Sequence, residues 1–191
     1  MQNKIYVLVG PHGSGKSALA EQLISMGLHF VPVYTTYDLE KSSSQNLYHH
    51  IAVQEFREQD FIVKSTYKGQ YIGLRKDDVL SALHDHVISV TILEANCVKQ
   101  LRRIIRDNLN VIYLMADYVT LVDRMLRLNY TNNEIKYHLQ YAENNREFDG
   151  WKTADYVVKN TSSLQTALNQ VVSIMGLTTL VDEQKWAQLT K

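Results

Sequence analysis

Residues 10–17 read Gly-Pro-His-Gly-Ser-Gly-Lys-Ser and match the pattern G-x-x-x-x-G-K-[ST] of a phosphate-binding loop. The apolar run at residues 5–9, Ile-Tyr-Val-Leu-Val, precedes the loop and predicts a buried strand. Residues 17–24 follow it with apolar side chains at helical spacing. A strand, a glycine-rich turn and the start of a helix are the setting in which backbone N–H groups surround a phosphate chain. The stretch therefore predicts a nucleotide-phosphate site at the beginning of a P-loop domain.

The side chains of this loop have expected roles in holding ATP and Mg²⁺. Lys16 is expected to reach the β- and γ-phosphates, and the hydroxyl of Ser17 is expected to bind the metal. His12 is expected to space the turn. The predicted cofactor-binding residues of the loop are Gly10, Pro11, His12, Gly13, Ser14, Gly15, Lys16 and Ser17.

The composition is typical of one globular domain. The chain has 191 residues, 45% of them hydrophobic, which is enough to bury a single core. The 20 Lys and Arg residues balance 20 Asp and Glu residues, so no charge excess favours nucleic acid or an anionic membrane as a partner. The single cysteine, Cys97, excludes an intrachain disulfide and a cysteine-based zinc site. We expect a cytoplasmic protein, a monomer or homodimer, without a nucleic-acid or membrane partner.

Strand and helix patterns alternate along the chain. Strands are expected at residues 4–9, 30–34, 87–93, 110–115 and 156–158. Helices are expected at residues 16–26, 76–84, 96–107, 117–128, 132–147 and 162–175. This alternation favours a parallel sheet covered by helices on both faces. The predicted fold class is therefore α/β, a P-loop NTPase fold with a central parallel β-sheet flanked by helices.

We expect one domain over residues 1–191, made of a core and three further segments. The core is expected to include about residues 1–34, 75–127 and 150–176. Residues 35–74 interrupt the alternation and predict a small β-rich insertion, in which residues 39–46 form a flexible loop. Residues 128–149 suit a helical lid, and residues 177–191 form an amphipathic tail. An insertion and a lid around a phosphate loop fit a kinase that closes over two substrates.

Over residues 4 to about 175 the chain resembles the guanylate kinase superfamily, a group of P-loop nucleoside monophosphate kinases. The family's Gly-Pro-Ser-Gly-x-Gly-Lys is matched by residues 10–16, and its Thr-Thr-Arg by Thr35-Thr36-Tyr37. Further matches follow in the family's order: Leu47-Tyr48-His49-His50, Glu55-Phe56, Gly69-Gln70-Tyr71-Ile72-Gly73, Ile92-Leu93-Glu94, Arg124-Met125 and Val158-Lys159-Asn160. The resemblance implies ATP- and Mg²⁺-dependent phosphoryl transfer to a small phosphorylated acceptor.

The resemblance also implies roles for individual residues. Lys16 and Arg124 are predicted to be catalytic and to gather negative charge from the moving phosphoryl group, and Arg127, one helical turn further, is expected to share that role. Asn160 is predicted to contact the adenine edge. The residues predicted to bind the acceptor are Tyr37, Tyr48, Tyr71 and Glu94.

The acceptor side departs from the family's pattern. Two arginines that bind the acceptor phosphate in the family are replaced by Tyr37 and Glu40, which cannot make bidentate charged contacts with a phosphate. Val63 falls near the position of the guanine-reading glutamate, and His138 near that of a lid arginine. We therefore expect GMP to be a poor acceptor. Two other functions stay open: a nucleotide-binding regulator without efficient turnover, and a sugar-phosphate kinase of the ribose bisphosphate type.

Overall fold

The computed structural model describes residues 3–37, 47–67 and 69–177 of the chain. Three expectations lie outside the described residues: the flexible loop at 39–46, the placement of Glu40, and the tail at 177–191 except for its first residue. None of the helices in the described part of the chain has the length and apolar character needed to cross a lipid bilayer.

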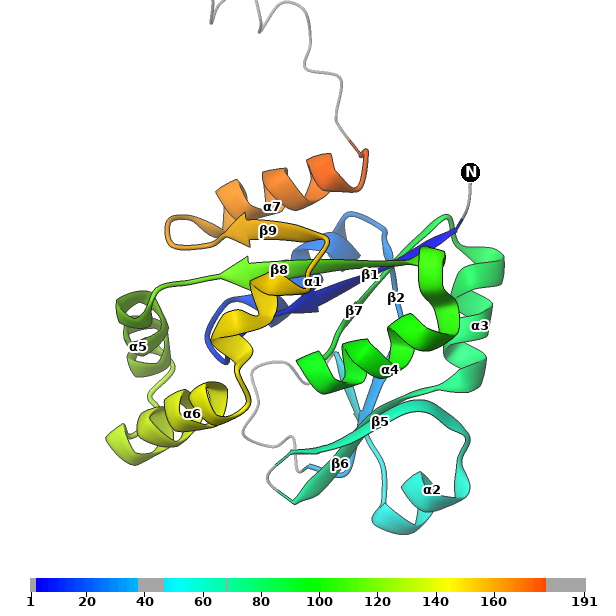
Figure 1. Cartoon of the computed structure of the whole chain (residues 1–191), viewed down its shortest axis with the longest axis horizontal. Helices are drawn as coiled ribbons and strands as arrows, with labels where there is room; N and C mark the ends of the chain where they lie inside the picture. Colours follow the sequence, from blue (N-terminus) through cyan, green and yellow to red (C-terminus); the bar gives the residue numbers. More distant parts are fainter. Residues whose placement is uncertain (1–2, 38–46, 68, 178–191) are drawn as a thin grey trace, which may run out of the picture.

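A five-stranded parallel sheet forms the centre of the molecule (Figure 1). Its strands lie in the order β2 (His29–Phe30), β7 (Ile88–Ile92), β1 (Lys4–Val9), β8 (Leu109–Met115) and β9 (Tyr156–Lys159). The central strand pairs Val7 with Thr91 of β7 and with Val111 of β8. The carboxyl ends of these parallel strands meet at one edge of the sheet, where ligands bind in open α/β folds.

The two faces of the sheet are separate hydrophobic cores because successive side chains of a strand point to opposite faces. Alternate residues of β1, among them Tyr6 and Leu8, pack with α1 (Lys16–Ser25) and α7 (Leu164–Ile174) on one face. The other residues, Ile5 and Val7 among them, pack with α3 (Lys76–Asp85) and α4 (Ala95–Ile105) on the opposite face. Strands buried on both faces read as continuous apolar runs, which is why the sequence predicts them well.

A second, four-stranded sheet lies beside the central one (Figure 1). Its order is β4 (Tyr48–His50), β3 (Val33–Thr35), β6 (Gln70–Arg75) and β5 (Phe61–Tyr67), with α2 (Val53–Glu58) between β4 and β5. The single strand expected at 30–34 is wrong, because Phe30 ends β2 in the central sheet and Val33 begins β3 in the second. Pro32 lies between them, and its missing N–H suits the point where the chain leaves one sheet for the other.

The segment between β8 and β9 is helical. It contains α5 (Tyr118–Arg127), α6 (Asn132–Asn144) and a 3₁₀ helix η2 (Glu147–Lys152), while another, η1 (Arg106–Asn108), precedes β8. The Thr131 hydroxyl accepts a hydrogen bond from the Glu134 N–H, and the Glu134 carboxylate accepts one from the Thr131 N–H, which forms a capping box at the start of α6. The helix expected at 132–147 ends at Asn144, and Arg146 then adopts a left-handed conformation with φ of 55°.

Replacing Leu114 by alanine should lower the free energy of unfolding by about 2–5 kcal/mol, because the side chain is fully buried on β8 and its removal leaves a cavity. Leu80 on α3, which is 49% exposed, is the matched control, and Leu80→Ala should cost less than about 0.5 kcal/mol. Urea unfolding of both variants measures the difference. Equal losses would contradict the packing of the core described above.

Candidate active site

A cleft of about 750 Å³ lies between the phosphate loop, the second sheet and the helical segment α5–α6. Of the residues predicted from the sequence to form the site, those that line it are Gly10, His12, Gly13, Gly15, Lys16, Ser17, Tyr37, Tyr48, Tyr71, Glu94, Arg124, Arg127 and Asn160. Pro11 and Ser14 belong to the loop but are buried beneath its surface. The fold therefore brings both the predicted donor side and the predicted acceptor side to one cavity.

The phosphate loop is shaped by close contact with the segment that follows β9. Gly15 adopts φ of 97° immediately before α1, a conformation that a side chain would strain. A Cβ atom at Gly15 would lie only 2.5 Å from Nδ2 of Asn160. The Nδ2 group of Asn160 donates to the carbonyl oxygen of Ser14 over 2.8 Å. Glycine is required at position 15 for both its backbone conformation and this contact.

Arg124 on α5 also connects the phosphate loop with the segment that follows β9. Its guanidinium donates to the carbonyl oxygens of Gly13 and Ser14, at 3.3 and 3.2 Å, and to that of Asn160, at 2.9 Å. Partial burial lowers the pKa of Arg124 from its usual value, and the charges of Asp117 and Asp123 oppose that shift. The structure thus places Arg124 against the phosphate loop, within the cleft that Lys16 also lines.

Asn160 is only 1% exposed, and its side chain contacts Ser14 and Arg124. These contacts make it a support for the loop. The predicted contact between Asn160 and the adenine edge stays a prediction.

Lys16 is folded back onto its own loop. Its ammonium donates to the carbonyl oxygens of Gly10 at 2.6 Å and Pro11 at 3.0 Å. Burial lowers the pKa of Lys16, and the negative charges of Glu147 and Glu94 partly offset this effect. The helix N-terminus and the ammonium place positive charge at the base of the cleft, where an anionic phosphate chain binds favourably.

Two carboxylates face this positive charge. Burial and the nearby charge of Glu147 raise the pKa of Glu94 from 4.5 to about 7, while Lys16 and a hydrogen bond with the Tyr141 hydroxyl act in the opposite direction. Burial also raises the pKa of Glu147, against the effect of Lys16. Glu94 directly precedes α4 at the end of β7, where the sequence predicted a site carboxylate.

Glu147 is a site residue that the sequence reasoning missed. The helical pattern of the sequence continues to residue 147 and predicts no distinct direction for this side chain. In the structure α6 ends at Asn144, and the left-handed residue Arg146 redirects the chain before η2 begins at Glu147. The position of Glu147 as a carboxylate at the end of the predicted helix is the sequence feature that could have indicated it.

The remaining predicted residues lie toward the edges of the cleft. Burial raises the pKa of Tyr48 to about 12, and its hydroxyl is hydrogen-bonded to Ser17. Tyr71 stacks on Phe56 of α2 with ring centroids 5.2 Å apart. The side chain of Arg127 is 77% exposed and forms an ion pair with Asp123 at 2.9 Å, so it lies at the rim rather than against the phosphate loop.

An aromatic cluster joins the helical segment α5–α6 to the phosphate loop. The His12 ring stacks on the His138 ring of α6, with centroids 3.9 Å apart and planes 11° apart. His12 Nε2 and the Tyr130 hydroxyl are 3.1 Å apart, within hydrogen-bond distance. His12, expected only to space the turn, therefore forms a contact between the loop and the segment α5–α6.

Glu94→Gln should change how stability depends on pH. Between pH 4.5 and about 7 the folded chain holds a proton at Glu94 that the unfolded chain releases, so this stabilisation is lost as the pH rises through that window. Glutamine binds no such proton. The stability of the variant relative to the natural chain should therefore increase by about 1–3 kcal/mol over the same window. Urea unfolding at several pH values measures the difference, and a flat difference would contradict this account.

The comparisons with known proteins agree with the geometry. The family model described as guanylate kinase matches residues 2–177. A crystal structure of guanylate kinase from Anaplasma phagocytophilum superposes with a TM-score of 0.70 at 16% identity, over 92% of this chain and 86% of that one. The crystal structure of TT1252 from Thermus thermophilus gives a TM-score of 0.53 at 16% identity, over 94% of this chain and 100% of that one.

A search of curated proteins found no match. The structural likenesses, at this identity, establish an α/β fold with a central parallel sheet flanked by helices. Together with the family model, which spans most of the sequence, they confirm the resemblance inferred from the motifs: the chain belongs to the guanylate kinase family.

Proposed function

We propose that the protein transfers the γ-phosphoryl group of ATP, with Mg²⁺, to a small phosphorylated acceptor. Membership in the guanylate kinase family implies a phosphotransferase that acts on nucleotides. The observation that supports the proposal most directly is the convergence of Lys16 and Arg124 on one phosphate loop. The proposal includes a reducing compartment, the cytoplasm, which suits the 1% exposed thiol of Cys97.

The residues of the cleft fit a magnesium-bound nucleotide. The cleft of about 750 Å³ lies within the usual range of ligand pockets. The close approach of Asn160 to Gly15 keeps the loop free of side-chain bulk at the start of α1. The first backbone N–H groups of that helix have no partners within it and are available to phosphate oxygens. The Ser17 hydroxyl would hold Mg²⁺, which supplies neutralisation of phosphate charge.

In this proposal catalysis is positioning and charge stabilisation. Lys16 exchanges its loop carbonyls for phosphate oxygens, and Arg124 supplies a second positive charge from α5. Glu94, which follows β7, lines the same cleft as Lys16 and the acceptor-side tyrosines and would orient the acceptor. The stacked pair of His12 and His138 holds the lid close to the loop, which excludes water from the transferring group.

A sugar phosphate is the second candidate acceptor. The part of the cleft formed by the second sheet includes Thr35, Tyr37, Gln70 and Tyr71. Tyr37, Gln70 and Tyr71 present hydroxyl and amide groups, which suit an acceptor with several hydroxyl groups. The Thr35 hydroxyl is already bonded to the Tyr71 carbonyl. An ADP-release screen across nucleoside monophosphates and phosphorylated sugars separates the two classes of acceptor.

Lys16→Ala should weaken binding of Mg-ATP by about 10- to 100-fold, the usual effect of losing a charged hydrogen bond. Lys76 on α3 is a matched control because it is half-exposed and pairs with Asp60 on the surface. Lys76→Ala should bind Mg-ATP as the natural chain does. Titration calorimetry of the three proteins tests the site, and equal affinities for Lys16→Ala and the natural chain would refute it.

Turnover with GMP should be poor. Each lost charged contact to the acceptor phosphate costs about 1.5–3 kcal/mol, and each 1.36 kcal/mol is about tenfold in rate. Tyr37→Arg should restore part of the loss, because Tyr37 lines the cleft and is exposed at its edge. We expect this variant to raise kcat/KM for GMP by about tenfold. A coupled assay with Mg-ATP and GMP measures kcat/KM for both proteins. A value of about 10⁵ M⁻¹s⁻¹ or more for the natural chain would contradict the prediction.

A further inference from the structure

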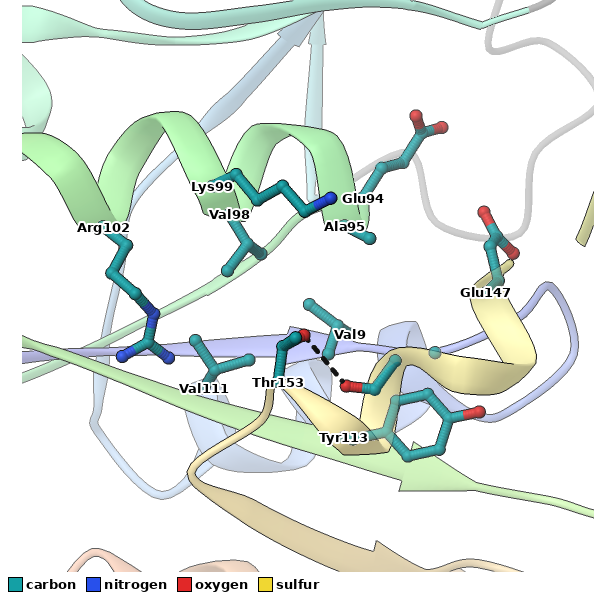
Figure 2. Close-up of a pocket in the computed structure, with 12 residues that line it drawn as sticks. Val9, Glu94, Ala95, Val98, Lys99, Arg102, Val111, Tyr113, Glu147 and Thr153 are labelled. Atoms are coloured by element: carbon teal, nitrogen blue, oxygen red, sulfur yellow. Dashed lines mark hydrogen bonds between the residues drawn. The ribbon is translucent and has the colours of Figure 1, made fainter. Parts of the chain in front are cut away.

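A second, smaller cavity of about 380 Å³ opens beside the cleft (Figure 2). It lies between α4 on one side and η2 with the following turn on the other, above β1 and β8 of the central sheet. The two hollow spaces meet at Gly10, Glu94 and Glu147, which line both of them. The other residues that line this cavity have no part in the proposed phosphoryl transfer.

The floor and one wall of the cavity are apolar. Val9 and Val111 come from the sheet, Val98 comes from α4, and the ring of Tyr113 completes the surface. The η2 segment fits closely against this ring, since a Cβ atom at Gly150 would lie 2.9 Å from two carbon atoms of Tyr113. A cavity of about 380 Å³ with these apolar walls suits a small ring rather than a polar chain.

The charged groups are divided between the two ends of the cavity. Glu94 and Glu147 stand at the end that joins the cleft, and Arg102 stands at the other (Figure 2). Arg102 is already neutralised, because its guanidinium donates to both carboxylate oxygens of Asp155, at 3.2 and 2.8 Å. Lys99 extends from α4 with its ammonium on the Glu94 side of the cavity (Figure 2), but the residue is exposed, and water weakens its field.

The negative charges of Glu94 and Glu147 therefore determine which kind of ligand this cavity favours. They are half-buried, and partly buried charges interact more strongly than exposed ones. Lys16 is the cation that acts on both of them in the structure, and burial still raises the pKa of each carboxyl. Lys16 donates to the Gly10 and Pro11 carbonyls, and Glu94 is hydrogen-bonded with Tyr141. A carboxylate can accept several hydrogen bonds, so this end can bind further donors.

We propose that this side cavity binds a small ligand with a flat apolar ring and a cationic or N–H-donating end, its ring over Val98 and Tyr113 and its donor end at Glu94 and Glu147. Two sources share this chemistry: a nucleobase with its amino and ring N–H groups, and an aromatic amine. An occupant here contacts η2 through Glu147, with its ring in the side cavity and its donor end at the border with the cleft.

Disulfide capture of small fragments tests the site directly. Thr153 lines the cavity and is exposed, so Thr153→Cys places an accessible thiol at its edge. The natural Cys97 gives little background, because it is 1% exposed and burial raises its pKa to about 12. The full-length variant is incubated under limiting reductant with three matched disulfides that carry a benzylamine, a benzoate or a toluene group, and with a fourth that carries an aminopurine. Intact-mass spectrometry measures the captured fraction.

The benzylamine or the aminopurine fragment should be captured at least about fivefold more than the benzoate and toluene fragments. Preference for the aminopurine would identify a nucleobase, and preference for the benzylamine an aromatic amine. Glu147→Gln in the Thr153→Cys background should reduce the preference to about twofold or less. The control thiol is Val119→Cys on α5, which is 79% exposed and should show no preference.

Three results would overturn the proposal. The first is equal capture of all four fragments at Thr153→Cys. The second is a preference for the benzoate, which would show that Lys99 and Arg102 govern the cavity. The third is an amine preference that Glu147→Gln leaves unchanged. Thermal melting of each variant confirms that it is folded, and the fragment comparison in Thr153→Cys alone needs no substitution of a buried residue.

Discussion

The buried amide of Asn160 is the contact on which the site depends. It lies after β9, and its Nδ2 group donates to the Ser14 carbonyl of a loop 146 residues earlier in the chain. Arg124 binds both the loop and the backbone of Asn160, so three distant segments share one small hydrogen-bond network. A buried network of this kind is costly when one member is missing, because its partners are left unsatisfied. The shape of the phosphate loop is therefore a property of the whole fold and not of the glycine-rich motif alone.

The sequence predicts those parts of the fold whose side-chain pattern has one physical cause. β1, β7 and β8 are buried on both faces and read as apolar runs, and the glycine-rich loop has a fixed setting between strand and helix. Elements without such a pattern are missed or misplaced. The strand expected at 30–34 divides between two sheets at Pro32, and the short helix α2 within the second sheet leaves no sustained periodicity.

The same reasoning explains which site residues the sequence revealed. Lys16 and Glu94 follow predicted strands and reach the carboxyl edge of the sheet by topology alone. Glu147 reaches the cleft only because Arg146 adopts φ of 55°, which no residue preference at that position indicates. The contact between His12 and His138 joins residues 126 positions apart in two segments that the sequence treats separately. Such contacts depend on how α6 packs, and packing is not readable from local pattern.

The stacked histidines also connect two departures from the family's pattern. The sequence comparison placed His12 at a serine of the phosphate loop and His138 near a lid arginine, and the structure places these two rings 3.9 Å apart. An arginine at a lid position approaches the loop when phosphate is present to bind it. Two stacked aromatic rings attract each other without phosphate. The stacking holds α6 against the phosphate loop within the folded chain, and a contact formed on folding adds no ordering cost when a ligand binds. His12 and His138 therefore act together, as one contact that joins α6 to the phosphate loop.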